Sequence, residues 1–261
     1  MHASFPSQDN PLIRKLDSVF TLTEDERQAL DKLPMQLAVI KDDQDIVREG
    51  DRPTRCCLIL SGFAATSKIT ADGKRQITSF GIAGDIPDLH SLHLRVLDNS
   101  VSTLSTCRVG FITHDDLRDL CERHPRIAAA LWRETLIDGA IFREWMLNIG
   151  RREAYNRIAH LFCEMLVRLS AVGLVEDYAY DLPITQAELG DALGITTVHV
   201  NRVLQQMRAD GLIVTQGTRL AIPDWDRLKE VGEFNPSYLQ LEQGDLAALD
   251  AAQGRPSQRR A

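Results

Sequence analysis

TQAELGDALGITTVHVNRVLQQMRADGLI, residues 185–213, contains the start, turn and stop signals of two consecutive helices. Thr185 and Glu188 form a capping box, in which each side chain satisfies a backbone N–H group at the start of the first helix. Gly194 tolerates the positive φ that a sharp turn requires, and Thr196 can cap the second helix. This order of signals predicts a helix-turn-helix. An ordinary helical hairpin is the alternative.

The second of these helices has one apolar and one polar face. Its apolar residues recur at helical spacing, at Val200, Val203, Leu204 and Met207. Its other face carries Thr197, Val198, Asn201, Arg202 and Gln205. Residues 211–214 and 219–222, separated by a turn at Gln216 and Gly217, predict a short β-hairpin, or wing. Because winged helix-turn-helix units insert the second helix into the major groove, the pattern favours DNA binding.

The first half of the chain shows a different pattern, with short apolar segments between turn signals. These segments predict strands at 36–40, 45–48, 55–60, 63–70, 75–81 and 101–112. Glycine-rich corners at regular intervals are typical of a β-sandwich or barrel. Helices are predicted at 11–20, 23–33 and 114–124, on either side of the strands.

A long helix is predicted from Pro125 to about Gly150, since proline suits the first turn of a helix. Its apolar residues cover more than one face and therefore need two surfaces to bury them. One surface is the β-domain, and we expect the other to be the same helix of a second subunit. Burial of the whole helix within one chain is the alternative.

Composition limits the class of protein. The chain has 261 residues, 44% hydrophobic and 26% charged, with no long apolar run and no leader pattern at residues 1–10, so we expect a soluble, cytoplasmic protein. Five scattered cysteines fit a reducing compartment, and buried apolar roles are favoured over redox sensing. The net charge is −7. Residues 151–222 contain seven arginines and eight acidic residues, so this segment is nearly neutral. DNA affinity would therefore require the arginines to lie together on one face.

These patterns divide the chain into four parts and predict an α+β fold. A sensor domain with flanking helices occupies 11–124, the long helix 125–150, the winged helix-turn-helix 151–231 and a disordered tail 232–261.

The order of parts resembles the Crp/Fnr superfamily of bacterial transcription regulators. The resemblance rests on residues 46–51, 58–62, 73–76, 81–85 and 182–213. It implies a cyclic-nucleotide-binding-like jelly roll (β-roll), a dimerisation helix and a winged helix-turn-helix. It also implies a homodimer that binds a palindrome, with half-sites about one helical turn apart. RNA polymerase is a further partner expected of such a regulator.

The resemblance assigns base contacts to Thr197, Val198 and Arg202 of the second helix, next to Asn201. Arg202 suits bidentate binding to guanine, with a contact to phosphate alone as the alternative. Val198 stands where many members have Glu, and valine can touch only a thymine methyl group. We therefore expect an operator that differs from the site of the best-known members. Phosphate contacts are expected from Thr185, Thr196, His199 and Arg219. For His199 the alternative is a surface position without DNA contact.

The effector pocket implied by the resemblance comprises Gly84, Asp88, Asn99, Ser100, Phe142 and Arg143. Relatives that bind cyclic nucleotides hold the phosphate with backbone N–H groups and an Arg-Ser pair. Here Pro87 has no N–H group, and Asn99 has no charge. We therefore expect that neither cyclic AMP nor cyclic GMP is the effector. In the oxygen-sensing branch of the family, a cysteine cluster near the N-terminus binds an iron–sulfur cluster. Here no cysteine precedes Cys56, so neither an iron–sulfur cluster nor another cofactor is expected.

Two other functions compete with the regulator. Asp88, His90 and His93 form Asp-x-His-x-x-His, which in a cupin-like enzyme or a metal sensor could hold a metal ion. No other catalytic pattern is evident, so we expect that the protein is not an enzyme. In the second alternative, the β-domain is a protein-interaction module that binds no small molecule.

Overall fold

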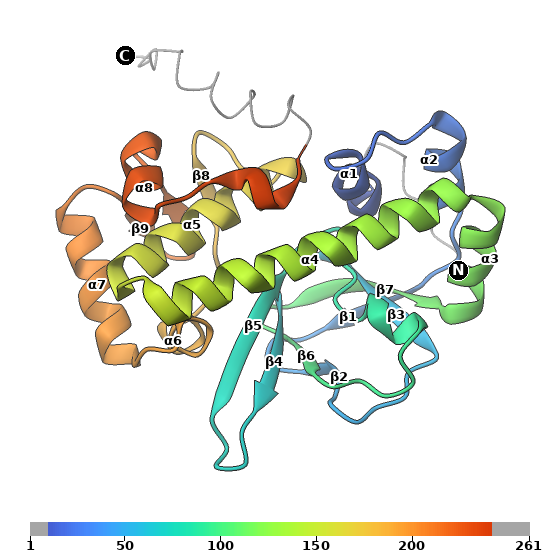
Figure 1. The fold of residues 1–261 in the computed structure, drawn as a ribbon, viewed down its shortest axis with the longest axis horizontal. Coiled ribbons are helices and arrows are strands. Elements are labelled where there is room, and N and C mark those ends of the chain that lie inside the picture. Colours follow the sequence, from blue (N-terminus) through green and yellow to red (C-terminus); the bar gives the residue numbers. More distant parts are fainter. Residues whose placement is uncertain (1–9, 242–261) are drawn as a thin grey trace.

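The computed structural model describes residues 10–241, in which one long helix runs between two packed units (Figure 1). The helices are α1 (Pro11–Asp17), α2 (Glu24–Asp31), α3 (His114–Arg123), α4 (Pro125–Arg151), α5 (Ala154–Ala171), α6 (Gln186–Leu193), α7 (Thr197–Ala209) and α8 (Trp225–Gly232), with 3-10 turns η1 (Leu89–Leu92) and η2 (Pro236–Leu239). In Figure 1, strands β1–β7 lie below α4, whereas α5 and α8 lie above it. The fold is α+β, as the sequence predicts.

The β-roll consists of two antiparallel sheets. Its strands are β1 (Gln36–Ile40), β2 (Asp45–Val47), β3 (Arg55–Ser61), β4 (Ala64–Ile69), β5 (Arg75–Gly81), β6 (Ser100–Thr103) and β7 (Cys107–Thr113). The first sheet has the order β1-β7-β3, and the second has the order β2-β6-β4-β5. The predicted strands 36–40 and 75–81 are therefore confirmed.

The single strand predicted at 101–112 is wrong, because the chain changes sheet within it. β6 pairs with β4 in the four-stranded sheet, and β7 pairs with β1 and β3 in the other. Between them, Leu104 and Ser105 donate their N–H groups to the Phe63 carbonyl, and the Ser105 hydroxyl accepts from Phe63 N–H at 3.0 Å. An alternating apolar pattern cannot reveal this crossing, since both strands alternate in the same way.

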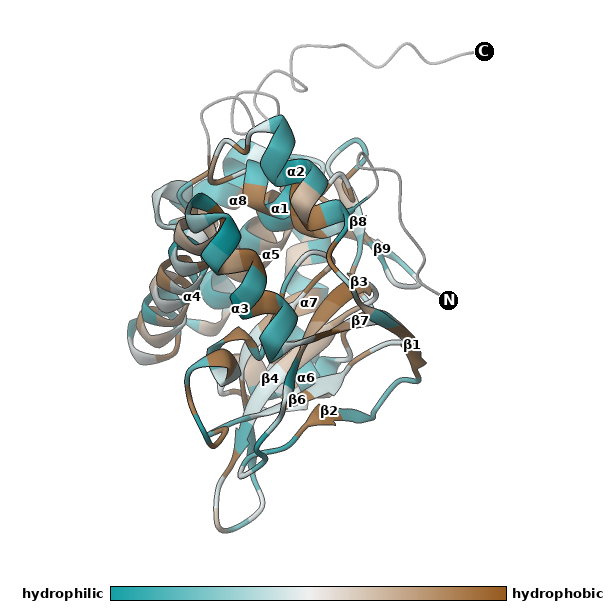
Figure 2. Ribbon diagram, turned by 90° about the vertical axis from the view of Figure 1, so that its right-hand side faces the viewer, coloured by the Kyte–Doolittle hydropathy of each residue, from teal (hydrophilic) through white to brown (hydrophobic). Residues whose placement is uncertain are grey.

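Helices α1, α2 and α3 close one side of the β-roll. Leu58 and Ile112 from the strands form a buried cluster with Leu16, Leu30 and Leu117 from these helices. In Figure 2, α2 and much of α3 are hydrophilic on the outside, whereas β1 and β3 carry apolar residues. The helices are therefore amphipathic and cover the sheet with their apolar faces. In this position, α1 packs against the corner that follows β5.

Helix α4 is only half buried within one chain. Its inner face includes Leu131, Ile137, Ile141 and Trp145, each at most 6% exposed. Its outer face leaves apolar side chains in solvent, with exposures of 69% for Trp132, 60% for Leu136, 73% for Met146 and 42% for Leu147. Phe142 and Ile149 are also partly exposed, at 42% and 37%. Burial of the whole helix within one chain, the alternative raised by the sequence, is therefore wrong.

The C-terminal unit extends beyond the expected boundary. Strands β9 (Val214–Gln216) and β10 (Arg219–Ala221) form the predicted wing, and β8 (Ala179–Asp181), which the sequence did not predict, adds to it in the order β8-β10-β9. The disordered tail predicted from 232 is wrong as far as residue 241, because Phe234 and Leu239 are buried and the Tyr238 hydroxyl donates to Glu164 at 2.8 Å. Residues 242–261 of that predicted tail lie outside the described residues.

Gly190 tests the packing of the two helices of the helix-turn-helix. A Cβ atom there would lie 2.6 Å from the Ile195 carbonyl oxygen, whereas one at Gly150 would meet no atom within 4 Å. We expect Gly190→Ala to lower the free energy of unfolding by about 1 to 3 kcal/mol through steric overlap. The control, Gly150→Ala, should raise it slightly because alanine favours the helix. Urea unfolding measures both, and equal effects would contradict the predicted crossing.

Candidate functional site

The helix-turn-helix is held by the contacts that its sequence predicts. The Thr185 hydroxyl accepts from Glu188 N–H at 3.2 Å, and the Glu188 carboxylate accepts from Thr185 N–H at 2.6 Å. Gly194 has φ of 65°, and the Thr196 hydroxyl accepts from His199 N–H at 3.3 Å. Each threonine oxygen thus serves as a cap, and its hydroxyl hydrogen is still able to donate outward. Two of the four predicted phosphate contacts, Thr185 and Thr196, therefore lie at helix N-termini, which favour anions.

The predicted base-contacting residues lie together on the outer face of α7. Val198 is 81% exposed, and Thr197 and Arg202 are exposed beside it. Asn201 differs, because its side-chain amide donates to Gln186 Oε1 at 3.0 Å and so joins α7 to α6. His199 is half buried. The face thus presents three free side chains and one that is already hydrogen bonded.

The wing carries a cation whose position the structure specifies. Arg219 lies on β10 and forms an exposed ion pair with Glu176, with Nη2 3.4 Å from Oε2. An exposed pair of this kind is worth little, so Arg219 can exchange its partner for a phosphate group. Nearby, Arg208 of α7 donates to the Thr215 hydroxyl at 3.4 Å. Two arginines therefore border the wing.

The helix-turn-helix is also attached to the β-roll. Arg75 Nε lies 2.8 Å from Asp191 Oδ2, and the Gln76 side chain donates to the Ala192 carbonyl at 3.1 Å. Both donors belong to β5, and both acceptors belong to α6. The orientation of the helix-turn-helix therefore depends on the position of β5.

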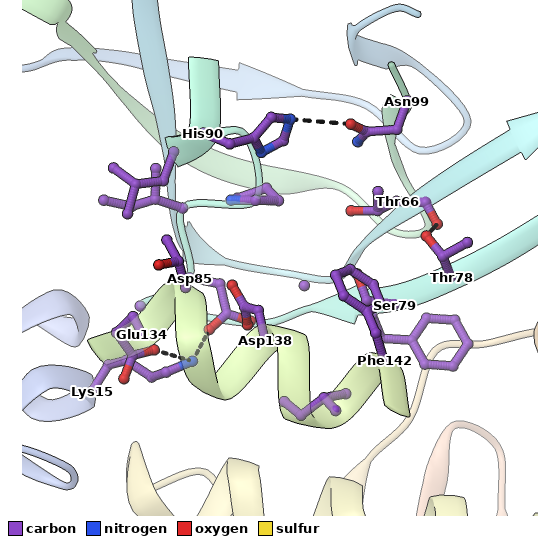
Figure 3. Close-up of a pocket in the computed structure, with 18 of the residues that line it drawn as sticks. Lys15, Thr66, Thr78, Ser79, Asp85, His90, Asn99, Glu134, Asp138 and Phe142 are labelled. Carbon is purple, nitrogen blue, oxygen red and sulfur yellow. Dashed lines mark hydrogen bonds and ion pairs between the residues drawn. The ribbon is translucent and has the colours of Figure 1, made fainter. Parts of the chain in front are cut away.

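A cavity of about 430 Å³ lies between the β-roll and α4 (Figure 3). Its walls come from α1, β4, β5, the segment 84–90, α4 and α5. Among the residues with polar side chains that line it are Lys15, Thr66, Lys68, Thr78, Ser79, Asp85, His90, Asp98, Asn99, Glu134, Thr135, Asp138 and Arg168. Its volume is in the range that small-molecule sites occupy.

Of the six predicted pocket residues, the structure places Gly84, Asn99 and Phe142 on this cavity. Gly84 serves mainly to let α1 approach, because φ is 94° and a Cβ atom would lie 2.6 Å from the Pro11 carbonyl oxygen. Its N–H group donates to the Ile59 carbonyl, so it does not face a ligand.

The other three predicted pocket residues do not line the cavity. Asp88 is 1% exposed, and its Oδ1 accepts from Cys57 N–H at 2.8 Å. Ser100 Oγ accepts from Glu49 N–H at 3.0 Å, and Arg143 borders a separate groove between α4 and η2. The resemblance to the family implies a place in the pocket for each of them. The local hydrogen bonds of this chain turn the first two away.

The floor of the cavity holds charged residues that the sequence analysis missed. The charged cluster, as we call it, consists of Lys15, Asp85, Glu134, Asp138, Glu164 and Arg168. Lys15 pairs with Asp85 and lies 3.2 Å from Glu134, and Arg168 lies 3.1 Å from Asp85 and 3.3 Å from Glu164. Asp138 and Glu134 are one and two turns before Phe142, so helical spacing from that residue could have found them.

The charged cluster shifts the pKa values of its members in opposite directions. Burial acts to lower the pKa of Lys15, but the carboxylates of Asp85 and Glu134 outweigh it and hold the pKa above its usual range. The pKa of Asp85 is lowered, because Lys15 and Arg168 outweigh the effect of burial. Asp138 is open to the cavity, yet displacement of bulk water by the surrounding protein raises its pKa to about 6, with Lys15 opposing. Burial likewise raises the pKa of Glu134.

The alternative metal site does not form. Asp88 is bonded to the Cys57 backbone, and His90 Nε2 lies 3.1 Å from Asn99 Oδ1. Within residues 10–241, no three His, Cys, Asp or Glu side chains are placed to share a metal ion. Two of the three side chains that the cupin-like alternative requires, Asp88 and His90, therefore have other partners.

The five cysteines are unpaired, and four of them are buried. Burial raises the pKa of the Cys56 thiol to about 12 and that of Cys107 to about 11. Neutral buried thiols favour the packing role that the sequence predicts. In residues 10–241, no helix combines the length and apolar character needed to cross a bilayer.

Two family models match the chain. They are the cyclic nucleotide-binding domain, over residues 38–124, and the Crp-like helix-turn-helix domain, over residues 156–231. Among curated proteins, the chain is similar to the anaerobic regulatory protein of Aggregatibacter actinomycetemcomitans, at 27% identity over 89% of this chain and 90% of the relative. The transcriptional activator protein FnrL of Cereibacter sphaeroides is 28% identical over 72% of this chain and 76% of the relative.

Solved structures share the fold. FixK2 from Bradyrhizobium japonicum superposes with a TM-score of 0.70 at 24% identity, covering 76% of this chain and 98% of that one. TTHB099, a regulator from Thermus thermophilus, superposes with a TM-score of 0.58 at 17% identity, covering 75% and 96%. The arrangement of β-roll, long helix and helix-turn-helix is therefore common to them.

The raised pKa of Asp138 predicts how stability depends on pH. At about pH 6 the folded chain holds a proton on Asp138 that the unfolded chain has lost, so stability should fall as pH rises through this region. Asp138→Asn should flatten the slope of unfolding free energy against pH between about pH 4 and pH 7. Asp119→Asn, at an exposed position of α3, is the control. An unchanged slope in Asp138→Asn would contradict the prediction.

Proposed function

Because the chain belongs to the Crp/Fnr superfamily of transcription regulators, we propose that it binds a palindromic operator as a homodimer and that a ligand in the β-roll cavity modulates this binding. Its helix-turn-helix marks it as a DNA-binding regulator. The observation that carries the proposal is the outer face of α7. There Thr197, Val198 and Arg202 are exposed on a helix whose N-terminus and turn are held by satisfied caps.

Base recognition is assigned to this exposed face. Arg202 can donate two parallel hydrogen bonds to guanine O6 and N7, and Val198 can contact a thymine methyl group. Thr185 and Thr196 are exposed at the N-termini of α6 and α7, and Arg219 is exposed on β10; all three are suited to phosphate, as is the half-buried His199. Asn201 holds α6 against α7 through Gln186, and thereby positions its neighbour Arg202.

The second subunit is assigned to the outer face of α4. Trp132, Leu136 and Met146 are at least 60% exposed and lie along one side of this helix. Pairing of two copies of α4 along this side would remove these side chains from water. Such pairing is isologous and would place two α7 helices for two half-sites about one helical turn apart.

The cavity is connected to the helix-turn-helix by direct contacts. Arg168 lines the cavity and belongs to α5, which packs against α8 and α7. Its guanidinium group donates to Asp85 at 3.1 Å and to the Phe80 carbonyl at 2.8 Å. A ligand that changes the position of Asp85 would therefore change the balance between orientations of the C-terminal unit, which is a population shift.

Several further properties belong to this proposal. The regulator acts in the cytoplasm, where it meets DNA and RNA polymerase, and it catalyses no reaction. It holds no iron–sulfur cluster, and its effector is not a cyclic nucleotide, because Pro87 and the uncharged Asn99 border the cavity and Arg168 is already paired with two carboxylates. The cavity favours a ligand sensor over a β-roll that serves only for protein interaction.

Selection of genomic DNA fragments by the purified protein, at two salt concentrations and without effector, tests the function. Enrichment of a palindrome is expected, with weaker retention at higher salt because binding releases counterions from phosphate. Enrichment that ignores sequence would contradict sequence-specific regulation. If no fragment is enriched, repetition in cell extract supplies a missing effector, and failure there too would overturn the proposal.

Arg202→Ala should weaken binding to the selected operator by about 1 to 3 kcal/mol and relax the preference at one base position. Titration of the operator and of its single-base variants, followed by fluorescence anisotropy, measures this effect. Arg123→Ala, exposed on α3 and remote from α7, is the matched control and should bind as the parent does. An equal loss on every sequence would show that Arg202 contacts only the DNA backbone.

Met146→Glu should convert the dimer to a monomer, because it places a charge on the outer face of α4, where Met146 is 73% exposed in one chain. Val39→Glu adds the same charge at an apolar residue of β1 with 68% exposure and should leave the dimer intact. Sedimentation equilibrium distinguishes the two states. A dimer that survives in Met146→Glu would place the subunit interface elsewhere.

A further inference from the structure

The charged cluster under the cavity contains more acid than base. Two cations, Lys15 and Arg168, face four carboxylates. The Glu164 carboxylate has three hydrogen-bond donors. It accepts from Arg168, from Trp145 Nε1 at 3.2 Å and from the Tyr238 hydroxyl at 2.8 Å. Asp85 is bound by both cations. The excess negative charge therefore falls on Glu134 and Asp138, which line the cavity.

Within residues 10–241, both carboxylates have oxygen atoms without a hydrogen-bond partner. Glu134 is 9% exposed, and although Oε2 lies near Lys15, its Oε1 is buried without any partner. Asp138 makes no hydrogen bond or ion pair within residues 10–241. Because a buried polar atom without a partner costs about 1 to 3 kcal/mol, Glu134 Oε1 requires a donor in the cavity, whereas Asp138 is exposed to the solvent there. In Figure 3, both side chains lie beside Lys15 on the same stretch of α4.

The opposite wall has one unpartnered donor. Asn99 is 7% exposed and uses its Oδ1 to bind His90 Nε2, while its Nδ2 is buried without a partner. Figure 3 shows this amide across the cavity from Glu134 and Asp138. One wall thus offers two carboxylates that can accept hydrogen bonds, and the opposite wall offers one amide group that can donate.

Apolar side chains border the space around these polar groups. Leu89, Leu131, Ile141 and Phe142 line the cavity, and Phe142 is 42% exposed on α4. An apolar or aromatic body would gain from contact with them. A phosphate or carboxylate placed on the floor would instead meet Glu134 and Asp138 and be repelled.

We propose that the cavity binds an organic cation, a primary amine with an apolar body and a hydrogen-bond acceptor at its far end. The ammonium group meets Glu134 and Asp138, and the acceptor takes the free Asn99 amide hydrogen. A metal ion does not fit, since no three carboxylate, imidazole or thiolate ligands in residues 10–241 converge on one point. This assignment of ligand class rests on the proposed function, in which the cavity is the effector site.

Three related small molecules test the chemistry on the full-length wild-type protein. Tyramine carries an ammonium group, a ring and a hydroxyl acceptor. Phenethylamine lacks the hydroxyl group, and 3-(4-hydroxyphenyl)propionate replaces the ammonium group by a carboxylate. Thermal shift and calorimetry at up to about 10 mM would reveal even millimolar dissociation constants. We expect tyramine to bind more tightly than phenethylamine, and the carboxylate not to bind.

Variants then locate the binding site. Asp138→Asn keeps the shape of the side chain and should weaken tyramine binding by about tenfold to a hundredfold, because it removes a charged hydrogen bond. Asn99→Ala should weaken tyramine but leave phenethylamine unchanged. Asp119→Asn is the control on the surface of α3.

Three results would overturn the proposal. They are binding of the carboxylate at least as tight as that of tyramine, no response to either amine, and tyramine binding that is unchanged in Asp138→Asn. The comparison of ligands on the wild type holds even if a variant fails to fold. Operator affinity, measured separately with and without tyramine, distinguishes the two proposals. An amine that binds without changing operator affinity would contradict effector control and leave the ligand class supported.

Discussion

The ion pair between Arg168 and Asp85 is the contact on which the arrangement of the two units depends. Arg168 belongs to α5 and Asp85 to the corner after β5, so one guanidinium group ties the C-terminal unit to the β-roll. Lys15 binds the same carboxylate from α1. Removing one partner from such a buried pair leaves an uncompensated charge, which is why this contact resists separation of the units. The cavity, α1 and the DNA-binding unit therefore meet at one carboxylate, that of Asp85, which we call the electrostatic junction.

Helix α4 connects this junction to other parts of the molecule, because it contacts α1, α3, β5, α5, α6 and η2. Its inner face closes the cavity through Glu134 and Asp138 and continues to Trp145, which donates to Glu164 of α5. Its outer face holds the apolar side chains assigned to the second subunit. Since a helix of 27 residues moves largely as a rigid rod, a change at the cavity and a change at the subunit interface are linked through it.

Local signals predicted the helix-turn-helix well and the cavity poorly. Thr185, Glu188 and Gly194 act on neighbours within a few residues, so their capping and turn geometry follows from spacing alone. Asp88 illustrates the opposite case. Its position matched the pocket of relatives, but its carboxylate turns to Cys57 N–H, 31 residues away in the chain. The order of residues does not show such a contact, because it depends on how the strands are paired.

By itself, the sequence determined the kind of fold, the positions of most helices and strands, and the face of α7 that remains exposed. These depend on periodicity and capping, which act over a few residues. Only the tertiary structure decided which charged groups meet. Lys15, Asp85, Glu134 and Arg168 come from four separate segments, and none has a local signal that marks it as part of a site. Long-range packing brings them together, and electrostatics at short distance then gives the cavity its acidic character.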